Sequence, residues 1–401
     1  MKRMKIIERK TGHIMALLIF LLATYPAFSQ TELEQLLQAA EKANPNLVAG
    51  QKLMEAKQWE YRTGLTPSDP EVEFAFMPGN SDVLGTKKLF SATQSLDFPS
   101  VYHYRNKLAN SQSEKAELDY RDFRQQLLLE TQLTYYELVY QKKRDQYLSD
   151  RVQNTVKLHE SLARKMDRGE ATILEVNKAR IQRIELENQL TIIRGNEQQL
   201  LDKLSWLCGD SLPALTRFSY REEFLPGKDS LFSDIIRMRP DLLSAKAGKS
   251  IAEEARKVAG AKGLPKLMVG YESETVPGEK YGGPKVGISI PIWSNKNNVK
   301  RAKAQQEWAA AQYTGKIKQG WFETERVYNL VESLQKSVEN YRNGLEEMSS
   351  IQLLNKSLQL GQISIIDYVT EMNYYIGAYE NYLSAEHDYY RALAALMRYR
   401  L

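Results

Sequence analysis

The stretch VYNLVESLQKSVENYRNGLEEM, residues 327–348, decides the fold of this chain. Its apolar positions advance by four and three residues in turn, and they are Val327, Val331, Leu334, Val338, Tyr341, Leu345 and Met348. A seam with this heptad spacing predicts a long helix packed against a partner helix in coiled-coil fashion. The same spacing runs from Leu186 to Leu207, where Glu197 occupies one core position.

Both seams belong to unusually long helical stretches. Residues 100–168 and 295–360 contain no proline and are rich in helix formers. At 1.5 Å per residue, each stretch would be roughly 100 Å long, far beyond an ordinary globular helix. Gly169 and Gly361 end these stretches, and we expect them to turn the chain back into second long helices at about 170–207 and 362–399.

Four short segments show the alternation of β-strands. In the first, Val72, Phe74 and Phe76 alternate with Glu71 and Glu73. This period of two predicts strands with one apolar face. By the same criterion we expect strands at about 71–77, 89–98, 266–275 and 284–292, with Pro277-Gly278 and Gly282-Gly283-Pro284 as loop residues.

The chain has an internal duplication. Asn44-Pro45-Asn46-Leu47 resembles Arg239-Pro240-Asp241-Leu242, 195 residues later, and Gly169 recurs as Gly361, 192 residues later. Each copy has the order helix, two strands, very long helix, glycine turn, long helix. We therefore divide the chain into a first repeat at 30–207, a linker at 208–230 and a second repeat at 231–401.

The N-terminus predicts a signal peptide. Five basic residues precede a short apolar segment at 14–23, and Ala27-Phe28-Ser29 fits a cleavage site, so residues 1–29 would be removed. Most of the excess positive charge lies in this segment, which leaves no case for nucleic-acid binding. The single cysteine, Cys208, excludes an intramolecular disulfide and is expected to be a packed residue.

The strands cannot form a closed structure within one chain. Four strands are too few for a barrel, and an open sheet leaves unpaired edges. In lipid, closure is obligatory, so several copies must contribute to one barrel. The alternative is a small soluble sheet packed on the helices, which explains neither the signal peptide nor the helix length.

The duplicated order of these elements resembles the TolC family of outer membrane efflux proteins over essentially the whole mature chain. The resemblance rests on Asn44-Pro45, Pro70, Phe98-Pro99, Ile290-Pro291 and the paired glycine turns. It implies a mainly α fold with a small β part, assembled as a homotrimer with a 12-stranded outer membrane barrel and a periplasmic α-barrel. It also implies two partners, a periplasmic adaptor and an inner membrane pump, for which we expect the RND class.

The resemblance also suggests functional residues at the hairpin tips. The tips of this family form the tunnel entrance and dock the adaptor, and here they are Arg168, Gly169, Glu170, Leu360, Gly361 and Gln362. Plain helix-turn chemistry is the alternative for these residues. Just beyond the second tip the family places acidic residues that narrow the tunnel.

Asp367 stands at the first of those constriction positions, whereas the second is Thr370, with Glu371 beside it. The departure at Thr370 leaves one ring of three charges rather than two. Alternatively, Asp367 pairs with a base or caps a helix. Glu175 occupies the corresponding position of the first hairpin.

Transport through such a tube needs no catalytic group, and the sequence presents no catalytic motif, cofactor motif or metal-ligand spacing. We therefore expect a passive duct for small solutes or metal cations, and two short segments resemble the heavy-metal efflux branch: residues 66–74 and 94–99. Two alternatives stay open: a duct for a type I protein or polysaccharide exporter, and a secreted coiled-coil scaffold. A periplasmic enzyme would need a cluster of titratable groups that the sequence does not show.

Overall fold

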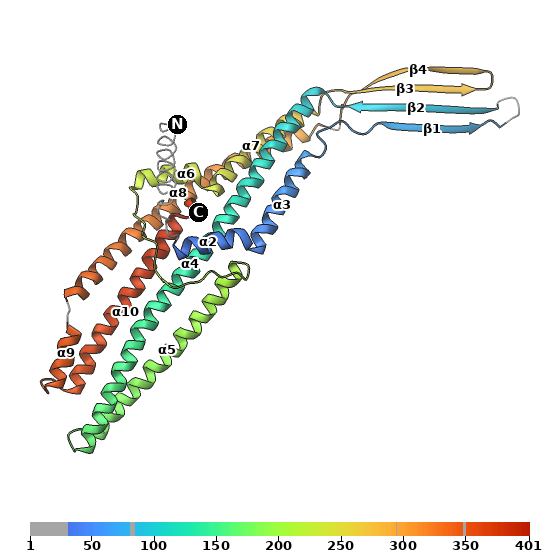
Figure 1. The fold of residues 1–401 in the computed structure, drawn as a ribbon. Helices are drawn as coiled ribbons and strands as arrows, with labels where there is room; N and C mark the ends of the chain where they lie inside the picture. Colours follow the sequence, from blue (N-terminus) through green and yellow to red (C-terminus); the bar gives the residue numbers. More distant parts are fainter. Residues whose placement is uncertain (1–30, 81–84, 294, 348–349) are drawn as a thin grey trace, which may run out of the picture.

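The computed structural model describes residues 31–80, 85–293, 295–347 and 350–401. The expected signal peptide lies outside these residues. Figure 1 shows an elongated molecule with the strands at one end and the tips of two helical hairpins at the other. The elements are α2 (Glu32–Ala43), α3 (Pro45–Arg62), β1 (Glu71–Pro78), β2 (Thr86–Leu96), α4 (Pro99–Asp167), α5 (Ile173–Leu207), α6 (Lys228–Met238), α7 (Pro240–Ala261), β3 (Lys266–Val276), β4 (Glu279–Ser289), α8 (Asn298–Glu347), α9 (Ser350–Gln359), α10 (Ile365–Leu396) and η1 (Arg398–Arg400).

The duplication is visible in the element order, because α3, β1, β2, α4 and α5 recur as α7, β3, β4, α8 with α9, and α10 (Figure 1). The starts of α3 and α7 and the starts of β1 and β3 are each 195 residues apart. The mainly helical architecture with a small sheet confirms the predicted fold class. Among the described helices, none combines the length and apolar character that a bilayer crossing demands.

The Asn44-Pro45 motif fixes the start of α3. The Asn44 side-chain oxygen accepts hydrogen bonds from the backbone N–H groups of Asn46 (2.9 Å) and Leu47 (3.3 Å), which caps the helix. Its amide nitrogen donates to the Leu207 carbonyl (2.9 Å), so one buried side chain also joins α3 to the end of α5. Pro45 begins the helix because its missing N–H needs no partner there.

In the second repeat, arginine replaces this asparagine. Arg239 precedes α7 and makes two hydrogen bonds of 2.7 Å to the Asp241 carboxylate. The start of α7 is therefore stabilised by an arginine–aspartate ion pair, whereas the start of α3 is stabilised by an asparagine cap.

The four strands form one antiparallel sheet in the order β1-β2-β3-β4. Strand β2 begins at Thr86, three residues before the expected start, and β4 begins at Glu279, five residues before it. The prediction that Gly282-Gly283-Pro284 is a loop is wrong, because all three lie within β4, opposite Tyr271 to Ser273 of β3. The reversal between β3 and β4 needs only Pro277 and Gly278, and the φ of Gly278 is 88°.

The long helices also differ in detail from the expected bounds. Helix α4 has 69 residues, or about 100 Å, whereas the expected helix at 295–360 is described as α8 and α9 on either side of residues 348–349. The return helices begin at Ile173 and Ile365, three residues later than expected, because capping boxes at Thr172 and Ser364 start them. The last helix ends at Leu396 and continues as a 3₁₀ turn.

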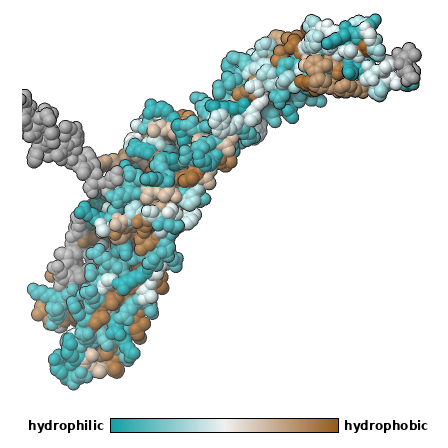
Figure 2. Space-filling view, turned by 45° about the vertical axis from the view of Figure 1, so that its right-hand side comes forward, coloured by the Kyte–Doolittle hydropathy of each residue, from teal (hydrophilic) through white to brown (hydrophobic). Residues whose placement is uncertain are grey.

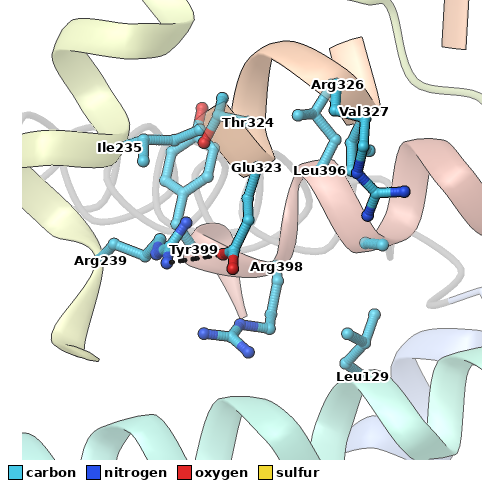
Figure 3. A pocket seen from close by; sticks show the side chains of 11 residues that line it. Leu129, Ile235, Arg239, Glu323, Thr324, Arg326, Val327, Leu396, Arg398 and Tyr399 are labelled. Carbon is cyan, nitrogen blue, oxygen red and sulfur yellow. Dashed lines mark ion pairs between the residues drawn. The ribbon is translucent and has the colours of Figure 1, made fainter. Parts of the chain in front are cut away.

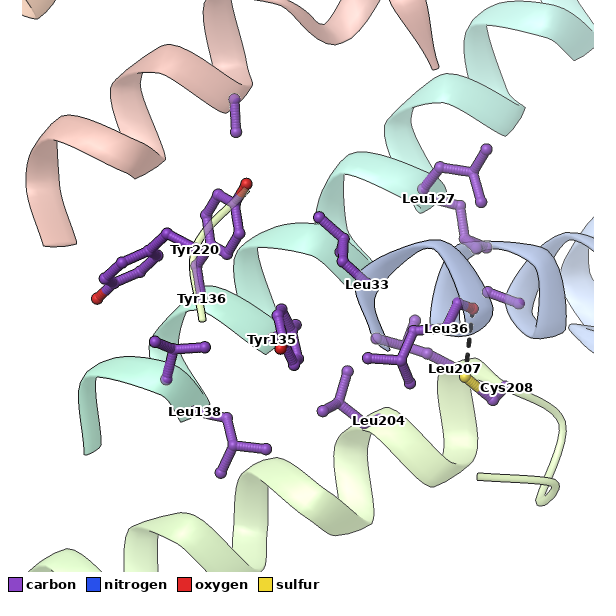
Figure 4. Close-up of a cluster of buried hydrophobic side chains, with 14 of the residues drawn as sticks. Leu33, Leu36, Leu127, Tyr135, Tyr136, Leu138, Leu204, Leu207, Cys208 and Tyr220 are labelled. Atoms are coloured by element: carbon purple, nitrogen blue, oxygen red, sulfur yellow. Dashed lines mark hydrogen bonds between the residues drawn. The ribbon is translucent and has the colours of Figure 1, made fainter. Parts of the chain in front are cut away.

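The largest core cluster lies in the middle of the molecule, where α2, α4 and the end of α5 meet (Figure 4). Tyr135, Leu138 and Leu204 are at most 1 % exposed there. The Cys208 thiol donates to the Leu36 carbonyl over 3.7 Å, and burial raises the pKa of this thiol to about 11. Cys208 is therefore a packed residue that stays protonated at neutral pH.

The α4–α5 hairpin has the predicted coiled-coil core, in which Leu186, Leu190 and Ile193 pack around Leu148. Glu197 is only 6 % exposed, and Lys142 on α4 lies 2.7 Å from its carboxylate. This buried carboxylate within an apolar seam penalises misaligned packing, since a shift would remove it from the lysine that pairs with it.

Candidate channel-forming surfaces

The sheet has one apolar and one polar face, and no other described element packs over either of them. Cross-strand partners share a face, so the register places Val72, Phe74 and Phe76 beside Phe90, Tyr271, Val269, Val286 and Ile288. Phe74 and Phe76 are 67 % and 66 % exposed, and Val286 is 73 % exposed. Figure 2 shows this surface as brown patches at the strand end of the molecule. An apolar surface of this kind fits contact with lipid.

The opposite face of the sheet is charged and predominantly acidic. By the register it carries five glutamates and three lysines: Glu71, Glu73, Glu272, Glu274, Glu279, Lys87, Lys266 and Lys285. The lysines are neutralised by carboxylates, since Lys285 lies 2.6 Å from Glu272, Lys87 2.8 Å from Glu274, and Lys266 3.2 Å from Asp97.

Glu71 and Glu73 form no ion pair within 4.0 Å among the described residues. The polar face therefore keeps an uncompensated negative charge near the base of β1.

The two hairpin tips are built alike. Gly169 and Gly361 have φ of 77° and 70°, where a side chain would be strained, although a Cβ added at either would meet no atom within 4 Å. The N–H of the residue after each glycine donates to the carbonyl five residues back, from Glu170 to Lys165 and from Gln362 to Ser357. Arg168 pairs with Glu170 over 3.1 Å, and Leu360 is 61 % exposed.

Two of the four constriction candidates, Asp367 and Glu175, belong to helix capping boxes. The Asp367 carboxylate accepts from the Ser364 backbone N–H (3.3 Å) and hydroxyl (2.7 Å), while the Asp367 N–H donates to the Ser364 hydroxyl (3.1 Å). Glu175 makes the same box with Thr172, whose N–H and hydroxyl lower the pKa of this exposed carboxyl. Both carboxylates thus stabilise the starts of the return helices.

Asp367 also begins an exposed row along α10. Thr370, Glu371 and Tyr374 follow it at helical spacing, and all are exposed in the single chain. The Thr370 hydroxyl donates to the Ile366 carbonyl (2.8 Å), so it offers no acidic group in place of the missing one. Asp367 and Glu175 lie on different hairpins, and no contact joins them.

Replacing Ser364 by alanine removes this capping box, and we expect it to lower the local stability of the α9–α10 hairpin by about 1 kcal/mol. Amide hydrogen exchange at the start of α10 should then speed up roughly fivefold, whereas Thr370→Ala, which removes a hydroxyl in the second turn, should have little effect. Equal exchange in both variants would contradict the capping role.

The sequence did not predict a buried polar cluster between the two hairpins. His387 on α10 is 4 % exposed, its Nε2 lies 2.9 Å from Glu137 on α4, and its ring stacks on Tyr140 with centroids 4.7 Å apart. Beside it, Lys143 lies 2.6 Å from Glu386. A histidine–carboxylate contact and a lysine–glutamate ion pair at neighbouring residues therefore hold α10 against α4. The partners are about 250 residues apart, so no local pattern could reveal them.

A second charged network lies where α7, α8 and the C-terminal turn meet α4 (Figure 3). It borders a hollow of about 240 Å³ lined by residues that include Arg239, Glu323 and Arg398. Arg239 lies 3.9 Å from Glu323, and Arg398 lies 3.0 Å from Asp122. These charges are paired with one another, so the network is structural. Within the described ranges no group of three His, Cys, Asp or Glu residues could hold a metal ion.

The family comparison identifies the second repeat. Residues 231–399 match the model of the outer membrane efflux protein family. The second half of the chain is an outer membrane efflux protein domain. This family consists of channel proteins rather than enzymes, and the match together with the fold confirms the TolC-type architecture predicted from the sequence.

Solved structures of membrane proteins share this fold over most of the chain. The VceC protein of Vibrio cholerae has 16 % identity and a TM-score of 0.78, covering 92 % of this chain and 95 % of that one. The CmeC channel of Campylobacter jejuni has 17 % identity and a TM-score of 0.77, covering 92 % and 85 %. A membrane protein from Pseudomonas aeruginosa has 18 % identity and a TM-score of 0.77, covering 92 % of each chain. No curated protein sequence matches this chain.

Proposed function

We propose that this protein is the outer membrane duct of an efflux system, assembled from three copies of the chain. The observation that carries the proposal is the four-stranded sheet, which has two unpaired edges and an exposed apolar face, and whose strands β3 and β4 lie within the segment that matches the outer membrane efflux protein family. The helices would continue the barrel as a periplasmic tunnel. An adaptor and an inner membrane pump, for which we keep the RND class, would supply the solutes.

The free edges of the sheet explain why copies must combine. Strands β1 and β4 each have a partner on one side only. Pairing β1 of one copy with β4 of the next repeats the antiparallel contact that β2 and β3 already make. Three copies would close 12 strands, which is within the range of outer membrane barrels.

The duplication predicts how the helices meet between copies. Within one chain, α7 of the second repeat packs along α4 of the first. The corresponding contact between chains joins α3, the counterpart of α7, to α8, the counterpart of α4. Both helices present large uncovered side chains, with Trp59 on α3 at 68 % exposure and Trp308 on α8 at 63 %. Three chains thus give six similar contacts, and three of them lie between subunits.

The duplication also predicts a pair of residues that meet between subunits. Ser244 on α7 donates a hydrogen bond to Asp119 on α4. In the duplication, Ser244 of α7 corresponds to Ala49 of α3, 195 residues earlier. Asp119 of α4 corresponds to Ala311 of α8, 192 residues later. These two alanines should face each other across the subunit boundary.

The polar face of the sheet would line the barrel. Its unpaired Glu71 and Glu73 would contribute six negative charges per trimer, and field lines from such a ring favour cations. This charge would favour the passage of small cationic solutes or metal cations. If the exposed row of α10 that begins at Asp367 faces the tunnel, Asp367 would add three carboxylates at the periplasmic end.

Conductance of the purified trimer in a planar bilayer tests the duct. We expect the wild-type trimer to conduct ions, with a preference for cations at low salt. The double variant Glu71→Gln/Glu73→Gln should have a cation-to-anion permeability ratio roughly twofold lower, and this difference should be smaller at high salt. Lys88→Gln, which alters a charge on the other face, is the matched control. Absence of any conductance from inserted trimers would overturn the duct itself.

A further inference from the structure

A cavity of about 280 Å³ separates the two helical hairpins above their tips. One wall is the last part of α4, and the other is formed by α9 and the start of α10. The lining residues are Asn154, Lys157, Leu158, Ser161, Leu162, Lys165, Asn355, Leu358, Gln359 and Tyr368. The leucines give it an apolar floor, whereas its other groups are polar.

The charged groups of this lining are all positive. Lys157 and Lys165 lie two turns apart on α4, and neither forms an ion pair within 4.0 Å among the described residues. The lining contains no carboxylate. Tyr368 is held in place because its hydroxyl donates to the Asn355 side chain over 2.8 Å. The cavity therefore offers two ammonium groups and several neutral hydrogen-bonding groups without an anion.

A buried arginine adds to this positive field. Arg151 lies less than two turns before Lys157 on α4 and is 8 % exposed, and no carboxylate of the described residues lies within 4.0 Å of it. Burial lowers the pKa of Arg151, and the nearby Tyr147 and Glu380 offset only part of this penalty. Its charge also acts on Tyr368, which lines the cavity. The Arg151 guanidinium lies over the Tyr147 ring, 5.8 Å from its centroid, and not against a carboxylate, so its positive charge adds to that of the two lysines.

The two repeats differ at these positions. The residues 192 positions after Lys157 and Lys165 are Ser349 and Ser357. The groove between the hairpins of one chain therefore carries lysines that the corresponding groove between neighbouring chains lacks. In a trimer only three of six similar grooves would be basic.

We propose that this cavity receives the carboxylate side chain of an acidic segment in the protein that docks on the hairpins. The proposal deepens the proposed function and rests on it. Charge complementarity selects the occupant: a carboxylate would accept hydrogen bonds from the Lys157 and Lys165 ammonium groups, and its aliphatic stem would lie on Leu158 and Leu162. A trimer would have three such contacts, one in the basic groove of each subunit. They would favour docking of the partner at these three grooves over the other three.

Carbodiimide coupling tests this directly, since it joins an amine to a carboxylate that touches it. The full-length complex, extracted in detergent, is mixed with a biotinylated hexaglutamate peptide, coupled, and mapped by peptide mass spectrometry. We expect saturable labelling at Lys157 and Lys165 at least fivefold above Lys178, an exposed lysine on α5. The variant Lys157→Gln/Lys165→Gln should lose avidin-detected labelling, whereas Lys178→Gln should keep it.

Two results would overturn the proposal. Uniform labelling of all three lysines would show that the cavity has no preference for a carboxylate. Complete competition by free glutarate at the same carboxylate concentration would assign the cavity to a small anion instead of a docking protein. The native mass of each sample is measured in parallel, so that an intact trimer without selective labelling contradicts this inference alone, and loss of the trimer contradicts the proposed function.

Discussion

Cysteines at Ala49 and Ala311 are expected to link the subunits of the assembled protein into covalent trimers under mild oxidation. These positions correspond to Ser244 and Asp119, whose side chains touch within one chain. Side chains in contact across packed helices place their Cβ atoms close to the separation that a disulfide requires. Each subunit would offer one cysteine to each neighbour, so denaturing gels should show mainly trimer, with dimer as the intermediate.

The controls for this result come from the same helices. Ala49→Cys alone and Ala311→Cys alone should remain monomeric on the gel, and native Cys208 should not interfere because it is buried. Ala49→Cys paired with Ala304→Cys keeps the same helix face but moves the partner by two turns, about 10 Å, which is beyond disulfide reach. Equal linking by both pairs would contradict the predicted register between subunits.

Replacing Phe74 by lysine is expected to abolish the outer membrane trimer, whereas replacing its neighbour Glu73 by lysine should not. Phe74 is 67 % exposed at the middle of β1 on the apolar face. A lysine on the lipid face of a barrel costs about 2–4 kcal/mol near the bilayer centre. Three copies would therefore lose roughly 6–12 kcal/mol, which is comparable to the whole stability of many domains.

Glu73→Lys alters the charge more than Phe74→Lys does, yet it faces the other side of the same strand. In a water-filled barrel the new lysine stays solvated, so trimers should reach the outer membrane in normal amount. Membrane fractionation followed by electrophoresis without boiling measures both variants. Normal trimer from Phe74→Lys would mean that this face does not contact lipid.

The regular elements were accessible from the sequence because each has its own period. The four-three steps around Leu186 and Val331 predicted helices that pack in pairs, and the alternation around Phe74 predicted an amphipathic strand. The duplication placed both hairpins in order along the chain. Strand limits were less accurate, as at Pro284, because glycine and proline favour loops locally, whereas pairing with β3 holds these residues in an extended strand.

The site was only partly predictable. The glycine turns were recognisable, but whether Asp367 caps a helix depends on the distance to Ser364, which the sequence alone left open. The Glu137–His387 pair and the cavity between Lys157 and Tyr368 join residues that are more than 200 positions apart. Such contacts result from packing of the two repeats, and no local pattern encodes them.

The number of chains in one barrel is the most direct test of the proposed channel. We would isolate outer membranes from cells producing the full-length protein, extract the complex in mild detergent without boiling, and measure its mass. We expect a single species of three mature subunits, mainly helical by circular dichroism. A periplasmic monomer or dimer that does not enter the membrane fraction would contradict it and would favour a secreted coiled-coil scaffold.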